Sequence, residues 1–310
     1  MSNSNFKGRR FFIILTNSLI FFVAAFLITM IGYYTIATLT GQNLLLTQKD
    51  VEFQNAIKYL IDNGIFFIMA LIFYLGAMQL VYSFLIIKWT IYLSDEQYLK
   101  HRFLVLIYSF FNLSFWTAFL LLSLDHGKMN TEIQVKRKMA FHETLLFSFT
   151  GIFSIIISLL LQTSTLNNPN IQSNFISTIS VGAITLGIGL LGAIFIGLYT
   201  RNEKKLHQQS DFYASKFINI LAKIFIAFNV IFVITKMVLI LVINTLGYIN
   251  QMFGNNRQGF FSRIGATINL ILMYTIVFQV FKALTTKNDE PLVIDLTNVQ
   301  TAAQTRATIF

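Results

Sequence analysis

The chain has no cysteine, very little proline and little charge. Its 310 residues include 0 Cys, 2 Pro and 12% charged residues. Without cysteine there is no disulfide, thiolate metal site, iron–sulfur cluster or cysteine nucleophile. Soluble globular domains carry about 25% charged residues, so a chain with this composition has too little polar surface to face water on all sides.

Hydrophobic residues are abundant, and the few charges are mostly positive. The hydrophobic share is 55% and the mean hydropathy is +0.66, which is typical of an integral membrane protein. The 23 Lys and Arg exceed the 13 Asp and Glu, for a net charge of +10. We interpret this excess as cytoplasmic loop charge that contacts anionic lipid, and we expect no nucleic acid partner.

Seven runs of residues are long and apolar enough to cross a bilayer. A charge at mid-membrane costs about 2.5 to 3.5 kcal/mol on insertion scales, so the charge-free runs mark the spans. Each must be a helix, because backbone groups in lipid need partners within the segment. The sequence therefore predicts an all-α, polytopic transmembrane bundle of about seven spans, near residues 11–34, 65–87, 103–124, 144–161, 176–199, 224–243 and 264–281.

Three segments outside the spans have a distinct character. Residues 1–10 form a basic head, and no small-residue cleavage site follows it, so we expect a retained first helix and not a signal peptide. Residues 50–62 place apolar and polar residues on opposite helical faces, which predicts an amphipathic connector at the interface. Residues 285–310 are polar and rich in Thr and Gln, which predicts a largely disordered tail.

The positive charges predict an orientation that the basic head contradicts. Loops with excess Lys and Arg stay in the cytoplasm, which places residues 128–138 and 201–216 inside. Seven spans then leave the C-terminus inside and the N-terminus outside, with 14 Lys and Arg inside and 8 outside. Two alternatives would bring the head inside: the first hydrophobic stretch crosses twice, turning near Gly32, or it does not cross. We expect a bacterial-type cytoplasmic membrane.

One predicted span carries a row of small residues. Thr185, Gly189, Ala193 and Gly197 are spaced four residues apart and share a helical face. Small residues allow two helices in lipid to approach closely, so this face predicts helix packing. The same device would also suit a homo-oligomer contact or a contact with a protein partner.

Lys236 is an ionisable residue inside the sixth predicted span. It lies 13 residues beyond Lys223, or about 20 Å along a helix, so its stem could extend the ammonium to the outer interface. The alternative is a buried contact with a polar or anionic substrate. We expect no Asp or Glu within any span, which argues against a carboxylate relay for proton- or sodium-coupled transport.

Two histidines give a weak indication of a metal site. His126 closes the third predicted span beside Asp125, and His142 precedes the fourth beside Glu143, so a hairpin could bring them together. Residues that merely mark helix ends explain the same pattern, and we expect no resident cofactor or metal. Motifs for serine hydrolases, zinc proteases and nucleotide-binding loops are absent, so we do not expect an enzyme.

The visible features favour packing over chemistry. We therefore expect a non-catalytic polytopic protein that serves as a scaffold or partner subunit of a membrane complex. The alternative is a permease or channel-like subunit for an anionic or polar solute, with the Gly189 helix as a moving element and Lys236 as a solute contact.

Overall fold

Every regular element that the structure describes is a helix. The computed structural model describes residues 3–39, 66–122, 129, 131–164, 169–208, 215–253 and 260–285. The predicted all-helical fold is confirmed for these residues. The helices are α1 (Asn3–Leu39), α3 (Phe66–Tyr92), α4 (Asp95–Lys100), α5 (Arg102–Phe111), α6 (Phe115–Leu122), α7 (Ile133–Ser164), α8 (Pro169–Gln208), α9 (Lys216–Phe253) and α10 (Phe260–Thr285).

Six of these helices, α1, α3, α7, α8, α9 and α10, are long and apolar enough to cross a membrane. Each contains one of the predicted spans, so the integral membrane class is supported. Helix α1 is continuous through Gly32, which makes a double crossing by the first stretch wrong. The amphipathic connector at 50–62 and tail residues 286–310 lie outside the described residues.

The third predicted span, 103–124, is two short helices, and a seventh crossing is not confirmed. Helix α5 has 10 residues, or about 15 Å, which is half the thickness of the hydrocarbon. Between α5 and α6, Leu113 has a φ of 56°, and the Ser114 amide donates to the Ser109 carbonyl at 2.9 Å. A left-handed residue followed by an amide that bonds to the carbonyl five residues earlier is typical of a helix C-terminus.

Polar side chains from two other helices stabilise this break. The Asn112 amide donates to the Ser83 hydroxyl on α3 at 3.0 Å, and the Asn17 amide of α1 donates to the Thr117 hydroxyl of α6 at 2.9 Å. All ten residues of α5 are buried, in contact with α3, α6, α7 and α10. Helix α5 is therefore a core element and not a lipid-facing span.

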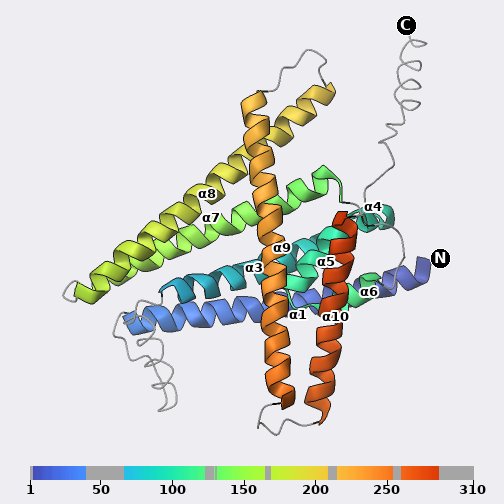
Figure 1. Ribbon diagram of the computed structural model, residues 1–310, viewed down its shortest axis with the longest axis horizontal. Helices are drawn as coiled ribbons and strands as arrows, with labels where there is room; N and C mark the ends of the chain where they lie inside the picture. Colours follow the sequence, from blue (N-terminus) through green and yellow to red (C-terminus); the bar gives the residue numbers. More distant parts are fainter. Residues whose placement is uncertain are drawn as a thin grey trace.

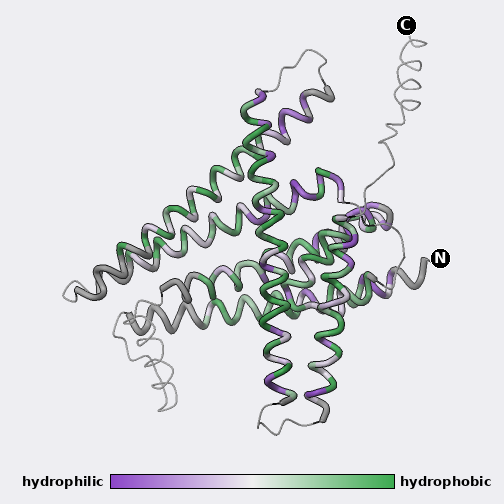
Figure 2. The backbone as a smooth tube through the Cα atoms, viewed as in Figure 1, coloured by the Kyte–Doolittle hydropathy of each residue, from purple (hydrophilic) through white to green (hydrophobic). Residues whose placement is uncertain are grey.

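The long helices form three pairs: α1 packs on α3, α7 on α8, and α9 on α10 (Figure 1). The α9–α10 pair runs crosswise to the α1–α3 pair, and α7 contacts both α3 and α9. Figure 2 shows hydrophobic residues along most of each long helix, with hydrophilic residues gathered around α4, the start of α7 and the end of α8.

Contacts between charged and polar side chains connect the helix ends at this hydrophilic end. Arg10 at the start of α1 forms an ion pair with Asp95 at 2.9 Å and donates to the Leu93 carbonyl after α3. Arg137 near the start of α7 pairs with Glu203 near the end of α8. Lys138, next to Arg137, lies 2.9 Å from the Nε2 atom of His101 between α4 and α5, so the starts of α1 and α7 and the ends of α3 and α8 lie on the same side of the bundle.

Glycines set the close approach of α7 and α8. A Cβ atom added to Gly189 would lie 2.5 Å from the Ser148 hydroxyl oxygen and 2.8 Å from the Thr144 carbonyl oxygen. A Cβ at Gly151 would lie 2.5 Å from the Leu186 amide nitrogen. Distances below 3 Å mean that the two backbones must separate to accept a side chain, so packing here depends on glycine.

The seam differs in part from the predicted small-residue face. Gly189 is buried in the seam, but Gly197 is exposed, and a Cβ added to it would have no atom within 4 Å. Thr185 and Ala193 are only partly buried. The buried glycines of α8 are Gly182, Gly189 and Gly192. Steps of seven and three residues keep the glycines on the side of α8 that faces α7. Repeated steps of four residues, as in the predicted face, turn gradually away from that side. Gly189 is therefore used within the chain.

We predict that Gly189→Val separates α7 from α8 and lowers the free energy of unfolding by about 1 to 3 kcal/mol, as overpacking does. Gly197→Val is the matched control, because it makes the same change on the same helix where there is open space. Thermal unfolding in mild detergent measures both. Equal stability of the two variants would contradict the assigned seam.

Candidate functional site

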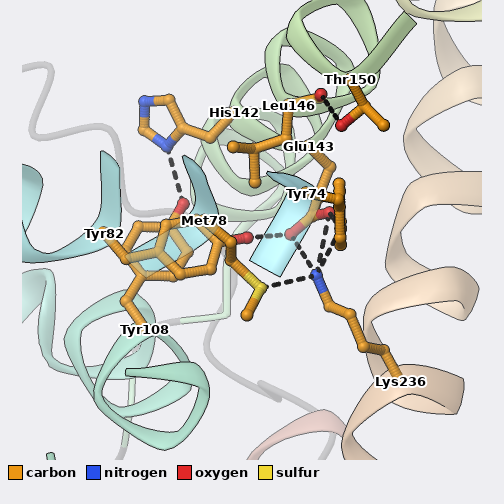
Figure 3. A network of polar contacts seen from close by, with 9 residues as sticks. All are labelled: Tyr74, Met78, Tyr82, Tyr108, His142, Glu143, Leu146, Thr150 and Lys236. Carbon is orange, nitrogen blue, oxygen red and sulfur yellow. Dashed lines mark hydrogen bonds and ion pairs between the residues drawn. The ribbon is translucent and has the colours of Figure 1, made fainter. Parts of the chain in front are cut away.

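A buried ion pair lies where α3, α7 and α9 meet. The Lys236 ammonium of α9 is 2.9 Å from Glu143 Oε1 and 3.0 Å from Glu143 Oε2 on α7 (Figure 3). The Lys236 side chain is 9% exposed and the Glu143 side chain 0%. Both charges therefore lie within the bundle, away from lipid and water.

The two charges occupy the inner faces of otherwise apolar helices. Glu143 lies on the same face of α7 as Met139 and Leu146, which are both fully buried in the core. Lys236 is flanked on α9 by Val233 and Met237, which belong to the same core cluster. A charge placed among such residues in a membrane needs a partner on a neighbouring helix, and each side chain supplies that partner for the other.

Helix α3 contributes three side chains that contact the ion pair. Tyr74, Met78 and Tyr82 are spaced four residues apart, so they line one face of the helix. Tyr74 accepts from the Lys236 ammonium at 2.9 Å and donates to Glu143 Oε2 at 3.0 Å, and Tyr82 donates to Glu143 Oε1. The Met78 sulfur lies 3.6 Å from the ammonium. On the α3 side, the ion pair therefore contacts two tyrosine hydroxyls and one thioether sulfur.

Aromatic rings complete the surroundings of the ammonium. The Lys236 nitrogen is 4.2 Å from the ring centre of Phe111 on α5, and 5.5 Å from that of Phe232 one turn earlier on α9. The Tyr74 and Tyr82 rings lie 5.3 Å and 5.8 Å away. Ring faces attract cations, most strongly where water is excluded, so this cage stabilises the charged lysine independently of the carboxylate.

Two sequence predictions about this region are wrong. Lys236 does not extend to the interface but is buried, and a carboxylate does lie within a span. The predicted fourth span began at Thr144, one residue after Glu143, because Lys136 to Lys138 and Glu143 looked like a loop. The helix begins at Ile133, which places Glu143 ten residues inside it. The spacing of Tyr74, Met78 and Tyr82 was the sequence signal for a polar face on α3.

The predicted histidine metal site is not assembled in the described part of the chain. His142 Nδ1 is 2.7 Å from the Tyr108 hydroxyl on α5, so a protein partner occupies this nitrogen. His126 lies outside the described residues. Within those residues, no three His, Asp or Glu side chains lie close enough to hold a metal ion.

The function has to be argued from the chemistry of this site. Comparisons of the chain with protein-family models, with curated proteins and with solved structures found no match. A fold alone does not specify an activity, and a helical bundle least of all. The arrangement that can be interpreted chemically is a lysine and a glutamate on two different helices, with tyrosines from a third.

We predict that breaking the pair destabilises the bundle and that removing both charges restores much of the loss. Glu143→Gln or Lys236→Met alone should lower the free energy of unfolding by about 3 to 5 kcal/mol, because each leaves one buried charge without its partner. The double variant should be more stable than either single variant. Thr150→Val on α7 is the control, since its hydroxyl bonds only to the Leu146 carbonyl of its own helix.

Thermal unfolding in mild detergent gives the comparison. If the two single losses simply add in the double variant, the carboxylate and the ammonium do not interact.

Proposed function

We propose that this protein is an integral membrane transport protein for a polar solute or ion, and that Glu143 and Lys236 form the link around which its helices move. The observation that carries the proposal is the buried pair between α7 and α9. Ionisable residues inside membrane bundles are costly and characteristically belong to solute or ion pathways. The expected absence of Asp and Glu from every span was the main argument for a purely structural role, and the buried Glu143 removes that argument.

Stability alone is a poor explanation for such a pair. Replacing a buried ion pair by hydrophobic residues of similar volume is often neutral or stabilising, so packing has no need of it. In contrast, a pair that joins two helix pairs gives the bundle two states, one with the charges in contact and one with them apart. Helix α9 packs on α10 and also on α7 and α8, so the link lies in the contact between α9 and the α7–α8 pair.

A cleft between α9 and α10 supports access for a polar solute. It has a volume of about 290 Å³ and includes Asn244, Tyr248, Gln251 and Asn269 among its lining residues. Amide and hydroxyl groups of this kind suit an uncharged polar molecule or a hydrated ion. Asn244 lies eight residues from Lys236 on the same helix, or about 12 Å, so the cleft is close to the pair.

We infer that the chain crosses six times, with both termini in the cytoplasm. If the α5–α6 segment enters and leaves on the same side, the basic head lies inside, and the conflict that seven spans create disappears. Of the 23 Lys and Arg, Lys236 lies in the bundle, 18 lie inside, and four lie outside, namely Lys49, Lys58, Arg257 and Arg263. The contact between Lys138 near the start of α7 and His101 between α4 and α5 supports this arrangement, because it places the start of α7 on the same side as the end of α3.

A role as a scaffold or partner subunit remains the second candidate. The observation that favours it is the concentration of charge at one end of the bundle, where Arg137 and Glu203 pair and Lys138 lies nearby. Such an end could bind a cytoplasmic protein or anionic lipid. A catalytic role finds no support in this geometry.

The two candidates differ in whether the helices move. Because the chain has no cysteine, pairs of spin labels can be attached at introduced cysteines without removing any native one. Leu71→Cys with Ile249→Cys labels exposed sites near one end of α3 and α9, and Tyr92→Cys with Ile220→Cys labels exposed sites near the other. Distance measurement by pulsed electron resonance reports both ends.

We predict two distance populations for each pair in lipid nanodiscs, and Glu143→Gln should change their ratio in opposite directions at the two ends. Transport by alternating access requires this opposite change, because one side closes as the other opens. Thr150→Val should leave the ratio as in the wild type. A single narrow population at both ends, unchanged by Glu143→Gln, would favour the scaffold and refute the transport proposal.

The six-span topology has its own test. In intact cells, an impermeant thiol reagent should label Asn250→Cys and should not label Ser4→Cys or Ser215→Cys until the cells are opened. This outcome places the starts of α1 and α9 inside and the end of α9 outside. Labelling of Ser4→Cys in intact cells would restore the seven-span orientation.

A further inference from the structure

Aromatic and histidine side chains extend from the ion pair toward the hydrophilic end of the bundle. The Tyr82 ring, whose hydroxyl donates to Glu143, stacks on the Tyr108 ring with centres 4.1 Å apart. The Tyr108 hydroxyl in turn bonds to His142 Nδ1 at 2.7 Å (Figure 3). The Trp89 ring centre is 5.7 Å from that of Tyr108 and 6.1 Å from that of His142.

This series continues to the hydrophilic end. His101 lies 5.5 Å from Trp89 between ring centres, and its Nε2 atom is 2.9 Å from the Lys138 ammonium. Burial lowers the pKa of His101, its hydrogen bond to the Gln97 carbonyl acts against this, and the positive charge of Lys138 lowers the pKa further, so the neutral ring is favoured. A neutral His101 donates from Nδ1 to the Gln97 carbonyl and accepts from Lys138 at Nε2.

We propose that Glu143 is a reversible proton-binding site at the inner end of this aromatic series, and that the proton is the ion coupled to movement of the helices. This inference rests on the proposed transport function and names its coupled ion. It uses the one carboxylate that the described spans bury completely, together with the polar contacts that surround it.

Protonation of Glu143 is a simple addition. A proton from the cytoplasmic water forms one O–H bond with the carboxylate and breaks no other bond of the protein. The charge of the site changes from zero to +1. Tyr82, which donates to Oε1 of the carboxylate, can turn its hydroxyl and accept from the new carboxylic acid, so the oxygen pair keeps a hydrogen bond in both states.

The aromatic cage makes this change tolerable. After Glu143 becomes neutral, the Lys236 ammonium still lies against Phe111 and Phe232 and still donates to Tyr74. Cation attraction to several ring faces offsets part of the lost ion pairing. The lysine can therefore stay charged, and the proton goes to the carboxylate without displacing the one on the ammonium.

The groups that face Glu143 are few. Among the described residues they are Tyr74 and Tyr82 on α3 and Lys236 on α9, with Tyr108 on α5 behind Tyr82. Its chain neighbour His142 bonds away from it to Tyr108. Lys236 is the only charged member of this set, so protonation of Glu143 alone removes the ionic attraction between α7 and α9. Helix α9 can then move with α10 relative to α7 and α8.

Infrared difference spectroscopy tests the site directly. In detergent-purified full-length protein, stepwise acidification should produce a protonated carboxyl band that shifts in heavy water. Glu143→Gln should abolish this band, and Glu203→Gln, which changes the carboxylate of the partly buried pair with Arg137, should retain it. Absence of a Glu143-dependent band would overturn the proposal.

These outcomes are separable from the test of transport. If the spin-label populations exist but no Glu143 band appears, the helices move without a proton and only this inference fails. If the band appears while each label pair gives one fixed distance, Glu143 titrates in a static protein, and the transport proposal fails together with the coupling.

Discussion

The interior of a bilayer offers no water to a charged side chain, and this constraint decides how α3, α7 and α9 are arranged. Glu143 and Lys236 lie 2.9 Å apart on helices that are otherwise apolar where they meet. Neither can face lipid at this depth, so both must point inward, and their rotational settings follow from that. Tyr74 and Tyr82 of α3 donate to the same carboxylate, because Glu143 needs more donors than the lysine provides.

The break between α5 and α6 accounts for a second property of the bundle. Two half-length helices joined at Leu113 fill the space among the longer ones. The first of them, α5, contributes Phe111 to the cage around Lys236 and Tyr108 to the contact with His142. The second of these helices, α6, is tied to α1 by the hydrogen bond between Asn17 and Thr117. Irregular backbone at membrane depth is found where protein surrounds it, and here α1 and α3 supply the polar partners.

Much of the fold could be predicted from the sequence, but the site could not. Run length and hydropathy are local properties, and six of the seven predicted spans fall on long helices. The break at Leu113 depends on Ser83 and Asn17, which are distant in sequence, so the run 103–124 looked continuous. Glu143 was predicted to mark the start of the fourth span because local charge density ends a predicted span, whereas only the position of Lys236 on another helix makes its burial possible. Gly189 was predicted to pack, but the line of contact along α8 depends on how α7 crosses it.

The complete burial of α5 has a consequence for how the chain is made. Helices of a membrane protein leave the insertion machinery in order, and each must tolerate lipid until its neighbours arrive. The ten residues of α5 contact α3, which precedes them, but also α7 and α10, which are synthesised later. Until α10 is in place, the side of α5 that packs on α10 remains uncovered. Assembly is therefore completed only by the last helix, and a chain that ends before residue 260 is left as a substrate for the proteases of membrane quality control.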